Sequence, residues 1–160
     1  MLSVKLICVG KLKEKFYIDA CQEYRKRLGA CCRFELLELN EYRLPENPGE
    51  KEIAVALGRE AAEILKSVPE GSFLVPLCIE GRLMPSEGMA RVIRERENSG
   101  RPRICFVIGG SYGLSPLVKQ KADLMLSMSP MTFPHHLARV MLLEQLYRGF
   151  KINEGSRYHK

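Results

Sequence analysis

A glycine-rich turn in the last third of the chain is the first candidate for a site that does chemistry. Residues 104–108 are apolar (Ile-Cys-Phe-Val-Ile), and residues 109–113 that follow are Gly-Gly-Ser-Tyr-Gly. Glycine permits close approach of the backbone to a ligand, and open α/β sheets bind small ligands where their strands end. The turn therefore predicts a small-ligand site, with a plain left-handed turn before a short helix as the alternative.

Three known motifs can be compared with this turn. A P-loop ends in Gly-Lys-Ser/Thr, and a dinucleotide fingerprint needs GxGxxG opening a full helix; residues 109–113 fit neither. The nucleophile elbow GxSxG is matched formally, with Ser111 in the correct place, but no strand–elbow–helix pattern or supporting acid accompanies it. The sequence therefore disfavours phosphoryl transfer from ATP, dinucleotide binding and serine hydrolysis.

A second loop follows closely and opens a helical stretch that we expect from Leu137 to Phe150. Residues 127–136 read Ser-Met-Ser-Pro-Met-Thr-Phe-Pro-His-His. Because the two turns are close in sequence, we expect them to clasp one ligand. His135 and His136 are adjacent, so they point to different sides, and no third ligand is near, which argues against a metal. For His135 a helix-bordering role and a catalytic or binding role both stay open.

The last residues combine cations with an aromatic ring. Arg157, Tyr158, His159 and Lys160 could supply phosphate contacts and a stacking surface for RNA, or could form a frayed terminus. The whole chain has 25 Lys and Arg against 19 Asp and Glu, with a net charge of +6. That balance suits a polyanionic partner without requiring one.

Strands alternate with helices around these candidate sites. The patterns predict strands at residues 4–9, 34–39, 73–79, 103–108 and 123–128, and helices at 16–28, 50–68, 84–98 and 137–150. The alternation predicts an α/β fold with a mostly parallel sheet and helices on both faces. Pro76 cannot donate to a ladder and predicts a bulge or break in the third strand. The length, 160 residues, predicts one domain, 1–160.

The last predicted helix is apolar on almost every side. One face carries Val140, Leu143, Leu146, Tyr147 and Phe150, and another carries Leu137 and Met141. Such a helix is buried on both sides, and in a chain of this length a second copy of the protein most easily covers the second side. Glu144 and Arg148 are spaced i,i+4 among these residues, either as a surface pair or as a pair at an interface or active-site edge.

The cysteines and the apolar stretches indicate the cellular compartment in which we expect the protein. The six cysteines form neither a CxxC pair nor a Cys/His ligand spacing, so we expect no metal. Free thiols in this number fit a reducing cytoplasm. The first ten residues lack the basic flank and cleavage region of a signal peptide, and no stretch reaches the ~20 apolar residues of a membrane helix. We therefore expect a cytoplasmic protein without a membrane partner.

Several stretches of the chain, including both turns and the tail, resemble the ribosomal RNA large subunit methyltransferase H family, whose members are small proteins of the SPOUT superfamily. The matching stretches run from the first strand to the tail: residues 6–11, 77–81, 106–115, 127–140, 144–148 and 158–159. The Gly-Gly turn alone would not be specific for this family, but the six stretches together are. Two departures are modest: the chain has no Trp, and His136 stands where the family often has proline.

The resemblance implies a C-terminal trefoil knot, an exception to the usual rule against knots. It also implies a homodimer, in which the tail of one subunit helps to complete the site of the other. The methyl donor would be S-adenosylmethionine, bound without a metal, and the substrate a pseudouridine of 23S rRNA, methylated at N3 within the large subunit or whole ribosome. The cofactor contacts would be Leu77, Gly109, Met128, Ser129, Pro130, Met131, Thr132 and Phe133.

Methyl transfer requires a nucleophile held in line about 3 Å from the methyl carbon. N3 of pseudouridine carries a proton that must leave, so a base or hydrogen bonds to the developing negative charge are needed. The candidates are His135 and His159 for the proton, and Arg139, Arg148 and Tyr158 for charge and stacking, with Glu144 orienting Arg148. Candidate phosphate contacts are Lys11, Lys13, Lys15, Arg101, Arg103, Lys151, Arg157 and Lys160.

Two other functions stay open at this point. A non-catalytic, ribosome-associated RNA-binding module would use the same basic surface but would not bind S-adenosylmethionine. A methyltransferase with the same knotted fold could instead act on another RNA or on a small molecule, because a fold does not determine a substrate.

Overall fold

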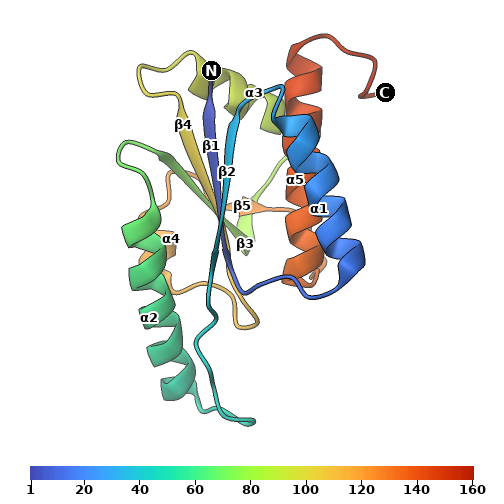
Figure 1. The fold of residues 1–160 in the computed structure, drawn as a ribbon. Coiled ribbons are helices and arrows are strands. Elements are labelled where there is room, and N and C mark those ends of the chain that lie inside the picture. The colour runs from blue at the N-terminus through green and yellow to red at the C-terminus, as the bar shows by residue number, and fades with distance from the viewer.

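Five parallel strands form the centre of the computed structural model, which describes residues 1–160 (Figure 1). Their order across the sheet is β2-β1-β4-β3-β5. Every paired strand is parallel to its neighbour, which confirms the predicted parallel α/β sheet. The strands are β1 (Ser3–Val9), β2 (Arg33–Leu39), β3 (Phe73–Leu83), β4 (Arg103–Ile108) and β5 (Leu126–Ser127).

Helices cover both faces of the sheet, as predicted. α1, α3 and α5 pack together on one face, and α2 and α4 contact each other on the opposite face (Figure 1). The four longer helices begin and end close to their predicted bounds. The helices are α1 (Lys15–Leu28), α2 (Glu50–Ser67), α3 (Ser86–Glu97), α4 (Pro116–Gln120) and α5 (His135–Asn153).

Local chemistry determines where several helices begin and end. α2 begins after Gly49, whose backbone N–H donates to the Glu52 side chain at 3.2 Å. α4 begins after Ser115, whose hydroxyl oxygen accepts the N–H of Leu117 at 3.2 Å. Basic residues fill the last turn of α1, where the helix dipole favours positive charge.

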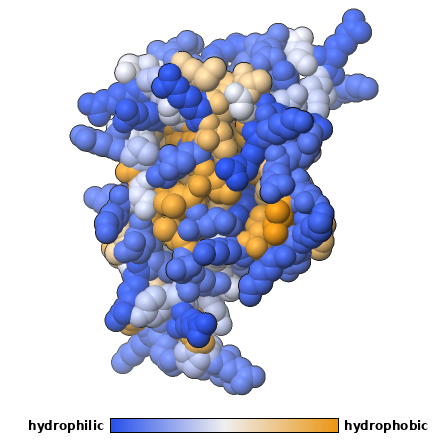
Figure 2. Space-filling view, in the orientation of Figure 1, coloured by the Kyte–Doolittle hydropathy of each residue, from blue (hydrophilic) through white to orange (hydrophobic).

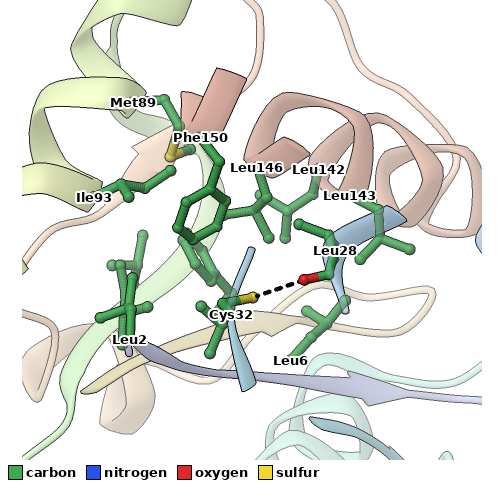
Figure 3. Close-up of a cluster of buried hydrophobic side chains, with 14 of the residues drawn as sticks. Leu2, Leu6, Leu28, Cys32, Met89, Ile93, Leu142, Leu143, Leu146 and Phe150 are labelled. Carbon is green, nitrogen blue, oxygen red and sulfur yellow. Dashed lines mark hydrogen bonds between the residues drawn. The ribbon is translucent and has the colours of Figure 1, made fainter. Parts of the chain in front are cut away.

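The core lies in two layers, one on each side of the sheet. The larger layer fills the space between the sheet and α1, α3 and α5, with Leu6, Ile93, Leu142 and Phe150 among its members (Figure 3). The smaller layer lies on the other side, where side chains such as Ile7 and Val107 meet α2 and α4. Burial on both sides is what a parallel sheet under two layers of helices requires.

The irregularity predicted at Pro76 is present, and the length predicted for the last strand was wrong. The pairing of β3 with β4 ends at Pro76. Directly after it, the pairing of β3 with β5 shifts between Leu77 and Arg82. β5 is only two residues long, and Asp123 before it is bonded to β3 outside the regular ladder: its carboxylate accepts the Leu74 N–H at 2.7 Å and its own N–H donates to the Leu74 carbonyl.

Some apolar surface is left without a partner. Phe16, in the first turn of α1, is 65% exposed. Leu137 and Met141, on the second side of α5, are half-buried. Figure 2 shows apolar side chains gathered in the middle of one face and framed by hydrophilic ones. No helix has the length and apolar character that crossing a bilayer would require.

Candidate active site

A cavity of about 760 Å³ lies at the carboxyl ends of β3 and β4. Three segments line it: residues 77–80 at the bend of β3, residues 108–114 after β4, and residues 126–135 between β5 and α5, all but Pro130. Its size is in the range of small-molecule sites. The two turns singled out in the sequence therefore line one cavity, although they belong to different connections of the chain.

The glycine turn exposes its backbone to this cavity because side chains do not fit there. A Cβ atom on Gly109 would lie 2.4 Å from the Gly113 carbonyl oxygen, and one on Gly110 would lie 2.6 Å from Oε1 of Glu41. Gly113 has φ +77°, in the left-handed region that favours glycine. The turn is therefore a tight structure whose peptide groups, rather than side chains, are presented to a ligand.

Glu41 supports this turn from outside and is not among the candidate residues singled out from the sequence. Its carboxylate accepts the backbone N–H of Ser111 at 2.8 Å. Glu41 follows β2 directly, so it lies at the carboxyl edge of the parallel sheet, where such sites form. In the sequence, the one available signal for this role of Glu41 was its place as an acidic residue just after a predicted strand.

The loop before α5 is shaped by its own serines. The Ser127 hydroxyl donates to the Ser129 carbonyl at 3.1 Å, and the Ser129 hydroxyl oxygen accepts the Met131 N–H at 2.9 Å. Hydroxyl groups commonly bond nearby backbone in this way and hold turns. Of the residues expected to contact the cofactor, all but one line the cavity; Pro130 belongs to the same loop but not to the lining. The lining members are Leu77, Gly109, Met128, Ser129, Met131, Thr132 and Phe133.

His135 is on the cavity wall, at the first residue of α5. Burial lowers its pKa, the neighbouring His136 lowers it further, and the Glu41 carboxylate acts in the opposite direction. His135 is therefore a neutral imidazole near pH 7, with a lone pair able to accept a proton or hydrogen bond.

Arg139 lies one turn further along α5 and inside the protein, 1% exposed. Its Nη1 donates to Oε2 of Glu38 at 2.7 Å, and its Nη2 donates to the Gly10 carbonyl at 3.1 Å. These bonds tie α5 to the ends of β1 and β2. Arg139 is not among the cavity-lining residues.

The other four predicted catalytic residues form a cluster at the far end of α5. Glu144 accepts two hydrogen bonds from Arg148, from Nε at 2.9 Å and Nη2 at 2.5 Å, and one from the Tyr158 hydroxyl at 3.3 Å. Nδ1 of His159 lies 3.1 Å from Nη1 of Arg148, and its Nε2 lies 2.9 Å from Oε1 of Glu87. Side-chain bonds therefore hold the tail, which is not a frayed terminus.

Within one subunit His135 and Arg148 are far apart, although Glu144 lines a smaller cavity that shares Leu126, Ser127 and Met128 with the first. His135 and Arg148 lie near opposite ends of the 19-residue helix α5, and a rise of 1.5 Å per residue separates them by about 20 Å. Figure 1 likewise shows the tail at the end of α5 opposite to the loop that enters it. Within one subunit His135 therefore lies on the cavity, Arg139 is buried one turn further along α5, and the other four candidates form the cluster around Arg148.

The cavity has the chemistry that a molecule with apolar and polar parts requires. Half of its 22 lining residues are hydrophobic, and the glycine turn adds peptide groups at close range. S-adenosylmethionine has both parts, and the cavity fits it. His, Cys, Asp and Glu side chains nowhere form a group of three that could hold a metal ion.

Comparison with known proteins agrees with this geometry. A family model described as "Predicted SPOUT methyltransferase" matches residues 2–159. The chain therefore belongs to the SPOUT methyltransferase family, and this membership implies the C-terminal trefoil knot. A solved structure of a probable methylase family protein from Haemophilus influenzae is similar over 98% of this chain and 70% of its own, with a TM-score of 0.51 and 16% identity. That similarity supports the fold alone.

Three much more similar sequences carry the name Ribosomal RNA large subunit methyltransferase H. The protein of that name from Streptococcus thermophilus is 45% identical, that from Clostridium novyi 44% and that from Streptococcus pyogenes 43%. Each alignment covers 99% of this chain and all of the relative. The family resemblance noted from the motifs is confirmed.

Proposed function

We propose that this protein transfers a methyl group from S-adenosylmethionine to N3 of a pseudouridine in 23S rRNA of the large ribosomal subunit. The observation that carries the proposal is the cavity between the Gly109 turn and the loop before α5, in a chain about 45% identical over its full length to proteins named as large-subunit rRNA methyltransferases. The pseudouridine and its N3 atom come from the family resemblance.

The cavity residues would divide the work of binding the methyl donor. Leu77, Met128 and Phe133 offer apolar surface, and the backbone of Gly109 and Gly110 offers hydrogen-bonding groups at close range. The bound cofactor supplies a methyl group on a positively charged sulfur. The chain's contribution is to hold both reactants in line, which is where most of the rate gain in such transfers arises.

The N3 proton must leave before or during attack. Among the cavity-lining residues, His135 is neutral near pH 7 because burial and His136 lower its pKa, so it can accept this proton. The negative charge left on the base needs a fixed cation. Arg148, held by two bonds to Glu144, suits that role, and Tyr158 beside it offers a ring for stacking. Arg139 would position α5 rather than contact the base.

A second subunit would bring these groups together. His135 and Arg148 are separated by about 20 Å along α5. The second side of α5, with the half-buried Leu137 and Met141, is suited to a partner surface. We therefore propose a homodimer in which the tail of one subunit closes the cavity of the other.

The basic surface would bind the rRNA backbone. Lys15 and Lys151 are paired with acids of their own helix or its end, whereas Lys11, Lys13, Arg157 and Lys160 make no ion pair. The unpaired cations are the better phosphate contacts, since a paired cation must first give up its partner. With six free thiols and a ribosomal substrate, the proposed location is the cytoplasm.

Transfer of tritiated methyl groups to bare 23S rRNA, large subunits and whole ribosomes tests the proposal. We expect label in one pseudouridine, located by mass spectrometry, and none in ribosomes that carry uridine at that position. Calorimetry with S-adenosylmethionine separates this function from a pure binding module, which would release no heat. Label in another RNA, or none at all despite cofactor binding, would contradict the proposed substrate.

A further inference from the structure

Glu87 is an acidic residue in the first turn of α3, and neither the motifs nor the family resemblance drew attention to it. Its carboxylate oxygen Oε1 lies 2.9 Å from Nε2 of His159, the residue before the last in the chain. The other ring nitrogen of His159, Nδ1, lies 3.1 Å from Nη1 of Arg148. The imidazole therefore bridges a carboxylate on α3 and a guanidinium on α5.

These two contacts determine the state of the His159 ring. A guanidinium N–H can only donate, so Nδ1 facing Arg148 must be the acceptor and carries no hydrogen. An ionised carboxylate can only accept, so Nε2 facing Glu87 must carry the hydrogen. The pKa of Glu87 is lowered by its own backbone N–H and by His159, which keeps this carboxylate ionised. The neutral imidazole with its hydrogen on Nε2 is the form that satisfies both neighbours.

This arrangement changes the role that His159 can have. Both ring nitrogens are engaged, so His159 has no lone pair left for the N3 proton. The guanidinium of Arg148 uses three of its N–H groups, two on Glu144 and one on His159. A guanidinium has five such groups, so two remain to bind another molecule. Arg148 is thus oriented from two sides and still able to donate.

We propose that Glu87 is a positioning residue for methyl transfer: it holds His159 in the Nε2–H form, so that Nδ1 keeps the two free N–H groups of Arg148 aimed at the target base. This inference rests on the proposed function and deepens it. When N3 loses its proton to His135 or to water, the negative charge spreads to the two carbonyl oxygens that flank N3. Two aligned N–H donors suit such an oxygen, and fixed donors act without reorganisation during the reaction.

Two substitutions of Glu87 and one control separate this role from a general effect on α3. Glu87→Ala removes the acceptor, whereas Glu87→Gln loses the charge but keeps an amide oxygen that can accept the Nε2 hydrogen. Both remove the same charge from the helix N-terminus, so any dipole effect cancels between them. Glu95→Ala is the control, because Glu95 is exposed on the same helix and makes no side-chain hydrogen bond or ion pair.

Nitrogen-15 NMR of the histidine rings reads the tautomer directly, in the full-length protein without cofactor or RNA. We expect Nε2–H for His159 in the wild type, in Glu87→Gln and in Glu95→Ala, and a mixture of tautomers in Glu87→Ala. His159→Ala identifies the signal. A wild-type His159 that is protonated on Nδ1, or an unchanged spectrum in Glu87→Ala, would overturn the proposal.

Kinetics supply the second readout. For Glu87→Ala we expect kcat to fall roughly tenfold, the value of one lost hydrogen bond, with the Kd for S-adenosylmethionine unchanged. Glu87→Gln should retain most of the activity. Equal losses in both variants would overturn the positioning role. A wild-type protein that holds the tautomer but transfers no methyl group to rRNA would instead contradict the proposed function, so the two failures are distinguishable.

Discussion

The two ends of α5 are built from different kinds of interaction. At its first residue, His135 faces a cavity shaped by backbone, in which Gly109 and Gly110 have no room for a side chain. At its other end, Arg148 belongs to a network of side chains that includes Glu144, His159 and Glu87. A site made of backbone does not tolerate added atoms. A site made of side chains tolerates replacements that keep each donor and acceptor.

The largest effect should come from the backbone end. Gly109→Ala places a methyl group 2.4 Å from a backbone oxygen, so the turn must move and the cavity changes shape. We expect the affinity for S-adenosylmethionine, measured by calorimetry, to fall by at least about 100-fold, or roughly 2.7 kcal/mol. Gly100→Ala is the matched control, because open space surrounds that position. Wild-type affinity in Gly109→Ala would remove the cavity from the mechanism.

At the side-chain end, Arg148→Ala should leave cofactor binding intact and lower turnover. Loss of one fixed donor to a developing charge typically costs about 100-fold in kcat. Arg91→Ala, an exposed arginine on α3 with no recorded side-chain bond, is the control. Tritium transfer to large subunits measures kcat, and the mass of the assembly should stay unchanged. A weaker affinity for S-adenosylmethionine with normal kcat would reverse the assignment of the two ends.

Arg139, between the two ends, should matter for folding more than for chemistry. Arg139→Ala leaves Glu38 and the Gly10 carbonyl without their buried donor, and we expect a loss of about 3 kcal/mol in the free energy of unfolding. Urea denaturation measures this loss, and kcat per folded molecule should change little. Lys15→Ala, which removes an exposed pair with Asp19, should have no measurable effect. A stable Arg139→Ala variant with low kcat would return Arg139 to the catalytic group.

The smallest effect concerns pH at the cavity. Because burial lowers the pKa of His135 in the folded protein, the unfolded chain binds a proton more readily there. This contribution to stability is complete above the ordinary histidine pKa of about 6.5 and is lost as the pH falls below it. Between pH 7 and pH 5 we therefore expect the unfolding free energy of the wild type to fall slightly more than that of His135→Gln. Equal slopes would mean that His135 is not desolvated.

Much of the fold could be predicted because the apolar residues repeat with clear periods. β1 and β4 are buried stretches, and the long helices start and stop at caps, prolines and glycines that can be recognised locally. Pro76 marked where the β3–β4 pairing ends, because proline has no N–H to donate, but the extent of the irregularity as far as Arg82 depends on how β5 pairs.

The order of residues along the chain determined by itself that this is a parallel α/β protein, where its turns lie and to which family it belongs. These properties depend on neighbours within a few residues or on motifs that can be read directly. The tertiary structure decided that Arg139 is buried, that Glu41 supports the glycine turn, and that Glu87 meets His159 across 72 positions of the chain. Such contacts join elements distant in sequence, and a donor or acceptor gains its role only when packing brings its partner within bonding distance.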